Sequence, residues 1–196
     1  IDADLAFVLD SGGSPGEIIV QAPAQDAIKV KITGRPAHAG LQPENGISAI
    51  MVAAKAIENM NLLRIDEETT ANIGIVKGGI ATNIVMPELE IFAEARSLSE
   101  EKLDNQTNHM VETFKKVAQD FGAEIDIEVK RAYAPFTIED NDEIVLLAKK
   151  AFSNMGIEGK TGSTGGGSDT NILNKNGVKA VNLGIGMKKA HTLEEY

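Results

Sequence analysis

The chain has 196 residues, of which 42% are hydrophobic and 24% charged, and its 19 basic against 29 acidic residues give a net charge of −10. This is a globular composition, long enough to bury one large core or two smaller ones. The absence of cysteine excludes disulfides, thiolate metal sites and cysteine nucleophiles. It is also typical of the reducing cytoplasm, where we expect the protein.

The negative charge disfavours nucleic acid and anionic membranes as partners, because the chain has no basic excess to bind phosphates. No apolar run approaches the roughly 20 residues that cross a bilayer. The opening Ile1-Asp2-Ala3-Asp4 lacks the basic segment of a signal peptide, and the missing initiator Met predicts a fragment or a processed chain. We therefore expect no nucleic-acid partner and no membrane partner.

The first part of the chain is expected to be a strand followed by a loop. Residues 5–9 are apolar and predict a buried strand that runs into the glycine-containing loop 10–16. Residues 17–20 predict a short edge strand. Residues 21–25, with Ala-Pro-Ala at their centre, are the expected crossing point into a second domain.

The middle of the chain has the pattern of a ferredoxin-like β-α-β-β-α-β unit, an antiparallel sheet covered on one side by two helices. The expected strands are 27–33, 71–76, 88–95 and 123–133, and the expected helices are 46–61 and one that begins after Ser99. The apolar face of the first helix is predicted to consist of Ile47, Ile50, Met51, Ala54 and Ile57.

After Pro135 the pattern predicts a helix over 142–155, a loop over 161–167, a short helix over 168–174 and a buried strand over 178–185. The two ends of the chain therefore belong to one α/β layer, interrupted by the compact unit. The expected domains are 1–25 and 135–196, which form parts of one catalytic, metal-binding domain, and 26–134 between them.

Two residues that follow buried strands are candidate metal ligands. Asp10 comes after the first strand, and ligands gather at the carboxyl ends of strands in open α/β sheets. His191 comes after the last strand, and imidazole is the commonest protein metal ligand. The alternatives are a turn-forming aspartate and a solvated histidine.

His38 is a candidate for a different role, as a hydrogen-bond donor. It lies in the loop 34–40, where a proline and two glycines hold it away from the sheet edge. There His38 could donate a hydrogen bond to a developing oxyanion. The alternative is a histidine that hydrogen-bonds only within its own loop. His109, in contrast, lies on an acidic amphipathic helix and is assigned to the surface.

The glycine-rich segment 165–169 could bind an anion through its backbone N–H groups. No lysine follows as in a P-loop, so a carboxylate suits it better than a nucleotide. The alternative is a helix start capped by Ser168 or Asp169. Asn83 and Arg96 are two further candidate binding residues. Arg96 could bind a substrate carboxylate through two hydrogen bonds, and the alternative is a surface ion pair.

Taken together, these segments resemble the M20 metallopeptidases, most closely their peptidase T-like branch. The matching stretches are Phe7-Val8-Leu9-Asp10, the loop 34–40, Ala81-Thr82-Asn83-Ile84-Val85-Met86-Pro87 leading to Arg96, Gly166-Gly167-Ser168-Asp169-Thr170-Asn171, and Val181-Asn182-Leu183-Gly184 followed by His191-Thr192 and Glu194. They occur in the family's order and span almost the whole chain.

The resemblance implies a two-zinc exopeptidase that removes an amino acid from short peptides, with manganese or cobalt as alternative metals. It makes Asp10 and His191 ligands of different ions and places His38 on a lid domain that reaches the partner's site in a homodimer. It assigns substrate contacts to Asn83, Arg96, Gly167, Ser168, Asp169 and Asn171.

The earlier half of the family, with the remaining ligands and the general base, has no counterpart here, and the chain stops before the family's final helix. We therefore expect this chain alone to be inactive, because two ligands do not build a two-metal site. The alternatives are an M20-type hydrolase of N-acyl amino acids and a non-enzymatic ligand-binding or dimerisation module.

Overall fold

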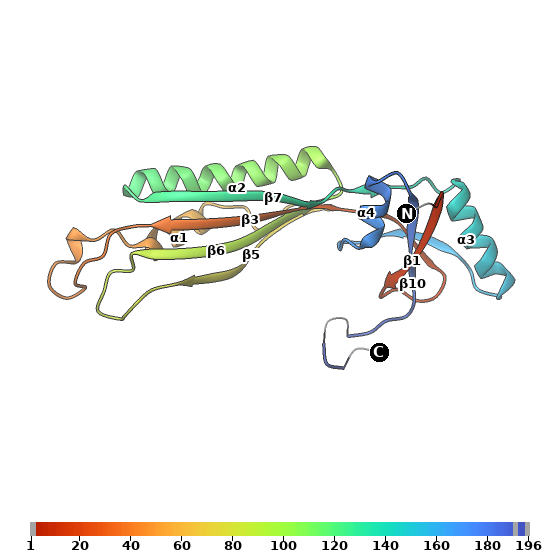
Figure 1. The fold of residues 1–196 in the computed structure, drawn as a ribbon, viewed down its shortest axis with the longest axis horizontal. Helices are drawn as coiled ribbons and strands as arrows, with labels where there is room; N and C mark the ends of the chain where they lie inside the picture. The colour runs from red at the N-terminus through yellow and green to blue at the C-terminus, as the bar shows by residue number, and fades with distance from the viewer. Residues whose placement is uncertain (1–2, 190–191, 195–196) are drawn as a thin grey trace. The chain divides into compact units, whose positions relative to one another are not determined.

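The computed structural model describes residues 3–189 and 192–194, and the chain forms two compact units (Figure 1). The terminal unit consists of Ile1–Ala24, Leu98–Glu100 and Tyr133–Tyr196, and the inserted unit of Gln25–Ser97 and Glu101–Ala132. No helix in the described part of the chain is long and apolar enough to span a membrane.

The inserted unit is a five-stranded sheet with two helices. Its strands are β3 (Ala24–Thr33), β4 (Leu63–Arg64), β5 (Thr69–Gly78), β6 (Glu88–Ser97) and β7 (Glu124–Tyr133), and its helices are α1 (Ala49–Glu58) and α2 (Glu100–Phe121). The order β4-β5-β6-β3-β7 contains the strand order of a ferredoxin-like unit. The expected fold is thus confirmed, with the two-residue β4 added at one edge.

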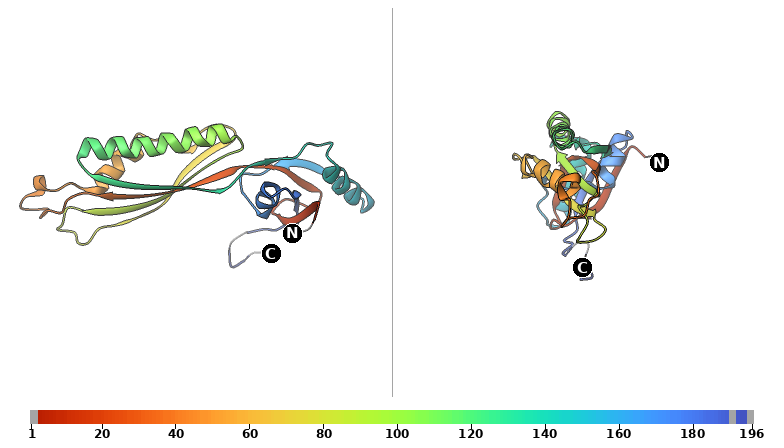
Figure 2. Two further views of the ribbon diagram at one scale, coloured as in Figure 1. Left: turned by 45° about the horizontal axis from the view of Figure 1, so that its top comes forward. Right: turned by 90° about the vertical axis from the view of Figure 1, so that its left-hand side faces the viewer.

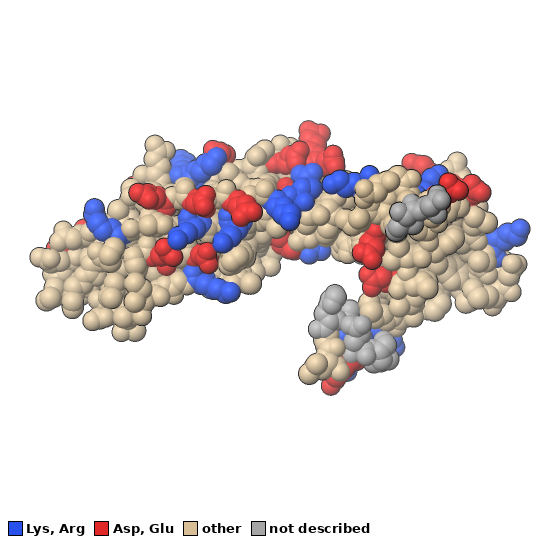
Figure 3. Space-filling view, viewed as in Figure 1, with Lys and Arg blue, Asp and Glu red and all other residues tan. Residues whose placement is uncertain are grey.

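The alternation along β3 decides which face of this sheet is covered. Ile28, Val30 and Ile32 are buried, because α1 and α2 lie on one face of the sheet (Figure 2). The opposite face carries ion pairs between β3 and β6, Lys29 to Glu90 at 3.2 Å and Lys31 to Glu88 at 2.9 Å. Basic and acidic side chains accordingly interleave on that face (Figure 3).

Helix α2 is held to the sheet by apolar packing and by one buried carboxylate. Met110 and Phe114 are fully buried against the sheet. Asp26, only 3% exposed, accepts hydrogen bonds from Thr107 of α2 at 2.8 Å and from Arg131 of β7 at 2.6 Å. This cluster ties the first strand, the long helix and the last strand of the unit together.

The predicted apolar face of α1 is wrong. The helix buries Ala49, Val52, Ala53 and Ala56, whereas Ile50 and Met51 are 40% and 58% exposed. Small side chains let α1 approach β6 closely, so the packing surface follows residue size and not hydrophobicity alone. Ile47, expected inside the helix, instead forms a β-bridge with Arg35.

The terminal unit is a second sheet with two helices. Its strands are β1 (Leu5–Ser11), β2 (Glu17–Ala22), β8 (Phe136–Thr137), β9 (Lys160–Ser163) and β10 (Lys179–Gly184), and its helices are α3 (Glu143–Asn154) and α4 (Asp169–Lys175). The order is β1-β10-β2-β8, with β9 also paired to β2. Asp142 caps α3, and its hydrogen bond from Lys179 lowers the pKa of its carboxyl group.

Two expectations for the strands of this unit are wrong. Residues 17–20 were expected at an edge, but β2 lies inside the sheet, with Ile18 and Ile19 buried. Residues 161–163 were expected in a loop, but they belong to β9, which runs parallel to β2. Both differences arise from pairing with distant strands, which local periodicity does not reveal.

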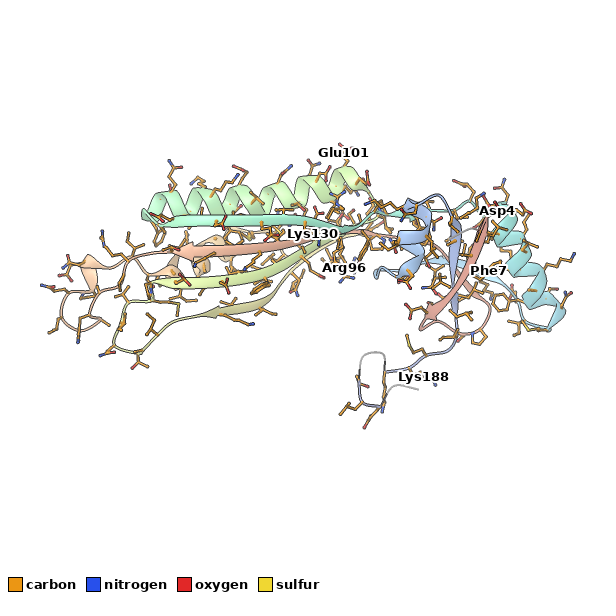
Figure 4. The ribbon with its side chains drawn as sticks, in the orientation of Figure 1. Asp4, Phe7, Arg96, Glu101, Lys130 and Lys188 are labelled. Atoms are coloured by element: carbon orange, nitrogen blue, oxygen red, sulfur yellow. The ribbon has the colours of Figure 1, made fainter. Side chains whose placement is uncertain are left out.

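Strand β1, on which Figure 4 labels Phe7, was expected to be buried. Phe7 and Leu9 are nevertheless 44% and 65% exposed. The strand pairs only with β10 and therefore forms an edge of the described sheet. An apolar groove of ≈540 Å³ lies beside it, lined also by Leu147 and Met155 of the α3 region. Its apolar sequence thus matches a strand covered on both faces, whereas the described residues leave one face open.

Candidate functional site

The inserted unit brings His38 and Asn83 together at one end. The loop after β3 and the loop before β6 pair through a bridge between His38 and Ile84. The backbone N–H of Ala39 donates to the carbonyl of Asn83 at 2.9 Å, and that of Val85 donates to Ala37 at 2.9 Å. Both candidate side chains are exposed there. We call residues 34–47 and 79–87 the tip loops.

The tip loops approach each other so closely that two of their glycines have no room for a side chain. A Cβ at Gly34 would overlap the carbonyl oxygen of Ile47, which is backbone. A Cβ at Gly46 would lie 2.8 Å from Val85. The position of His38 is therefore set by backbone packing and not by a flexible connection.

The ring of His38 makes one hydrogen bond inside its own loop. The backbone N–H of Gly40 donates to Nδ1 at 3.2 Å. The alternative of a bond within the loop is thus present, but it occupies only one of the two ring nitrogens. No residue among 3–189 and 192–194 bonds to Nε2, which is available to a ligand.

Arg96 lies on β6 (Figure 4) and is held by a neighbouring carboxylate. Its Nε and Nη2 donate to the two carboxylate oxygens of Glu94, each at 3.0 Å. Glu94 also accepts a hydrogen bond from Gln25 at 2.6 Å. A substrate carboxylate would therefore compete with an existing bidentate pair, which matches the surface ion-pair alternative.

In the terminal unit, Asp10 is exposed and is the sixth residue of β1, so it lies within the strand and not after it as expected. Its backbone N–H donates to Oδ1 of Asn182 at 3.0 Å. The Nδ2 of Asn182 donates to the hydroxyl of Ser168 at 3.2 Å. Asn182 thus connects two candidate site residues, and sequence reasoning missed this role although Asn182 stands in a matching stretch.

The glycine-rich loop leads into α4 as a capped helix start. Ser168 accepts the N–H of Thr170 at 3.3 Å, and Asn171 accepts the N–H of Ser168 at 3.1 Å, which together form a capping box. This is the capping alternative, realised by Ser168. Gly167 and Asp169 are exposed beside it, and a Cβ at Gly167 would overlap the ring of Tyr133.

Asn171 does not fit the expected substrate contact. Its side chain is fully buried and donates to the carbonyl groups of Pro23 at 3.0 Å and Ala134 at 2.8 Å. Because its amide is used within the protein, we assign it to holding the loop in place. Only tertiary structure could show this, since Pro23 and Ala134 are distant in sequence.

The described residues do not by themselves build a metal site. Within residues 3–189 and 192–194, no group of three or more His, Asp or Glu side chains could hold an ion. Asp10 supplies one exposed carboxylate, and His191 lies outside the described residues. The donors among the described residues therefore fall short of the ligands that a catalytic metal needs.

Comparison with known proteins identifies the inserted unit. Residues 26–121 match the peptidase dimerisation domain of the M20 family. The crystal structure of aminopeptidase PepT from Bacillus cereus is 46% identical, with a TM-score of 0.90, over 100% of this chain and 52% of that one. This chain belongs to the M20 peptidase family.

Two further relatives agree with this assignment. A tripeptidase structure from Staphylococcus aureus is 42% identical, with a TM-score of 0.94, over 100% of this chain and 52% of its own. YqjE, an uncharacterised protein of Bacillus subtilis, is 46% identical over 195 residues, 100% of this chain and 53% of its own. This M20 chain thus spans about half the length of these relatives.

Proposed function

We propose that this chain is part of an M20 exopeptidase that hydrolyses short peptides. The observation that carries the proposal is the paired tip loops, which present His38 and Asn83 side by side on a dimerisation domain. The similarity over the full chain to a PepT aminopeptidase and a tripeptidase supports this substrate class.

Each exposed candidate has a chemical part in this proposal. The free ring nitrogen of His38 donates a hydrogen bond to the peptide oxygen as it gains charge. Asn83 binds the substrate backbone through its amide. The loop at Gly167, Ser168 and Asp169 lies beside Asp10 and contacts the substrate. Arg96 binds the substrate carboxylate only when that carboxylate displaces Glu94 from its guanidinium group.

Asp10 and His191 are proposed as ligands of two zinc ions in the complete enzyme, with manganese and cobalt as alternatives. The described residues do not complete such a site. For the same reason we propose that the 196-residue chain alone is inactive. Metal-dependent peptide turnover by the purified chain would contradict this.

The experiment measures release of free N-terminal amino acids from di- and tripeptides by the full-length parent, with and without a chelator. His38→Ala and Asn83→Ala are expected to lower kcat, whereas His109→Ala, at a half-buried position of α2 outside the tip loops, is the matched control and retains it. Cleavage of N-acyl amino acids but not of peptides would favour the alternative hydrolase. No turnover by folded, metal-loaded parent would favour a binding module.

We also propose a homodimer in which His38 serves the partner's site. Parent proteins carrying His38→Ala and Asp10→Ala are each expected to be inactive. When the two are unfolded, mixed in equal amounts and refolded, each mixed dimer has one site with neither defect, so about a quarter of the sites recover. If His38 serves its own subunit, no site recovers.

A further inference from the structure

The two ring nitrogens of His38 have different environments, and this difference decides what the side chain can do. A backbone N–H can only donate a hydrogen bond. Because the N–H of Gly40 points to Nδ1 at 3.2 Å, Nδ1 is the acceptor and carries no proton in the neutral ring. The proton of the neutral ring therefore resides on Nε2.

The loop around His38 holds this arrangement in place. The carbonyl of His38 accepts the N–H groups of Leu41 at 3.2 Å and Gln42 at 3.1 Å, which closes a turn over Gly40. On the other side, Ala39 is fixed to Asn83. The donor N–H and the ring are thus both parts of one hydrogen-bonded loop.

We propose that Gly40 is a positioning residue whose backbone N–H fixes His38 in the Nε2–H tautomer, so that His38 acts as a hydrogen-bond donor and not as a base or metal ligand. The opposite tautomer would present a lone pair on Nε2. The ligand recognised at Nε2 is consequently an oxygen acceptor. Its identity as a peptide oxygen rests on the proposed function, whereas the tautomer does not.

His109 provides an internal comparison, because its ring is engaged through the other nitrogen. The backbone N–H of Asn61 donates to Nε2 of His109 at 3.3 Å, which leaves the proton of its neutral ring on Nδ1. The two described histidines are therefore expected to have opposite tautomers. The third histidine, His191, lies outside the described residues.

The test is long-range ¹H–¹⁵N NMR of the 15N-histidine-labelled chain at about pH 9, well above the usual histidine pKa of about 6.5. His38→Gln and His191→Gln assign the signals. We expect a protonated Nε2 and a bare Nδ1 for His38, and the reverse pattern for His109. A bare Nε2 in His38 would overturn the proposal.

Two substitutions of Gly40 test whether its backbone N–H, and not the absence of a side chain, sets the tautomer of His38. Gly40→Ala keeps the N–H, and its Cβ would lie 3.8 Å from the His38 ring, an ordinary contact. Gly40→Pro removes the N–H. We expect the His38 signals to keep their pattern in the alanine variant and to move toward a tautomer mixture in the proline variant, with His109 unchanged as the folding control. Unchanged His38 signals in folded Gly40→Pro would overturn the role of Gly40.

Activity of the full-length parent separates this inference from the proposed function. The amide of Gln places an N–H donor near the position of Nε2, whereas that of Asn lies near Nδ1. His38→Gln is therefore expected to retain at least tenfold more kcat than His38→Asn. Equal losses in both variants would contradict the donor role. If the NMR pattern holds but His38→Ala leaves peptide turnover intact, the proposed function fails and the tautomer assignment stands.

Discussion

Asn182 joins Asp10 and Ser168, two candidate site residues that are 158 positions apart in the sequence, through one buried amide. Only 4% of Asn182 is exposed. Its oxygen accepts from the backbone of β1 and its nitrogen donates to the residue that caps α4. A single side chain therefore links the glycine-rich loop to the strand that carries Asp10.

Asn182→Ala is expected to lower the free energy of unfolding by about 1–3 kcal/mol, because two polar groups lose their partner. It should also speed hydrogen exchange at the Asp10 amide. Denaturant unfolding and amide exchange followed by NMR measure the two effects, with the exposed Asn72→Ala as the control. Unchanged protection of the Asp10 amide would show that Asn182 does not hold this strand.

Gly34→Ala is expected to displace the tip loops, because its Cβ would overlap the backbone oxygen of Ile47. A displacement of about 1 Å at a catalytic group can lower kcat by about 10²-fold. Peptide turnover by the parent and its thermal midpoint measure the effect, with Gly74→Ala, whose Cβ would make only ordinary contacts, as the matched control. We expect kcat to fall by about this factor in Gly34→Ala and to be retained in the control, and native kcat in Gly34→Ala would contradict the packing argument.

Arg131→Met is expected to destabilise the inserted unit by about 3 kcal/mol, because it leaves the buried carboxylate of Asp26 without its cation. The hydrogen bond from Arg131 to Asp26, and a further one to Asp104, raise the pKa of Arg131 beyond its usual range. The double variant Asp26→Leu/Arg131→Met should recover part of the loss. Denaturant unfolding tests this, and a double variant less stable than Arg131→Met would refute it.

The lowered pKa of Asp66 makes the free energy of unfolding depend on pH. Asp66 accepts the backbone N–H groups of Glu68 at 2.9 Å and Thr69 at 2.8 Å and pairs with Lys102, and these contacts lower its pKa from 3.8 to about 2. A lowered pKa stabilises the folded state above pH 3.8, and this contribution is lost as the pH falls toward 2.

Asp66→Asn should therefore be less stable than the wild type above pH 3.8, and the difference should shrink as the pH approaches 2. Urea unfolding at a series of pH values measures it. Asp120→Asn, which alters an exposed i,i+4 ion pair on α2, is the control. A wild-type advantage that stays constant across this range would contradict the assignment.

Local patterns were enough to predict much of the inserted unit. The strands expected over 27–33, 71–76, 88–95 and 123–133 correspond to β3, β5, β6 and β7, and the helix expected after Ser99 is α2. These features repeat at the period of the backbone itself. The candidate residues at the tip were likewise visible, because proline and glycine mark the loop that carries His38.

Long-range packing decided the rest. The burial of Asn171, the interior place of β2 and the small-residue face of α1 depend on partners far along the chain. Which nitrogen of His38 faces a ligand depends on one backbone N–H of its folded loop. The amino-acid sequence by itself therefore determined the kinds of elements and the candidate side chains. Tertiary structure alone determined their neighbours, because hydrogen bonds and close packing are set by distances that sequence spacing does not contain.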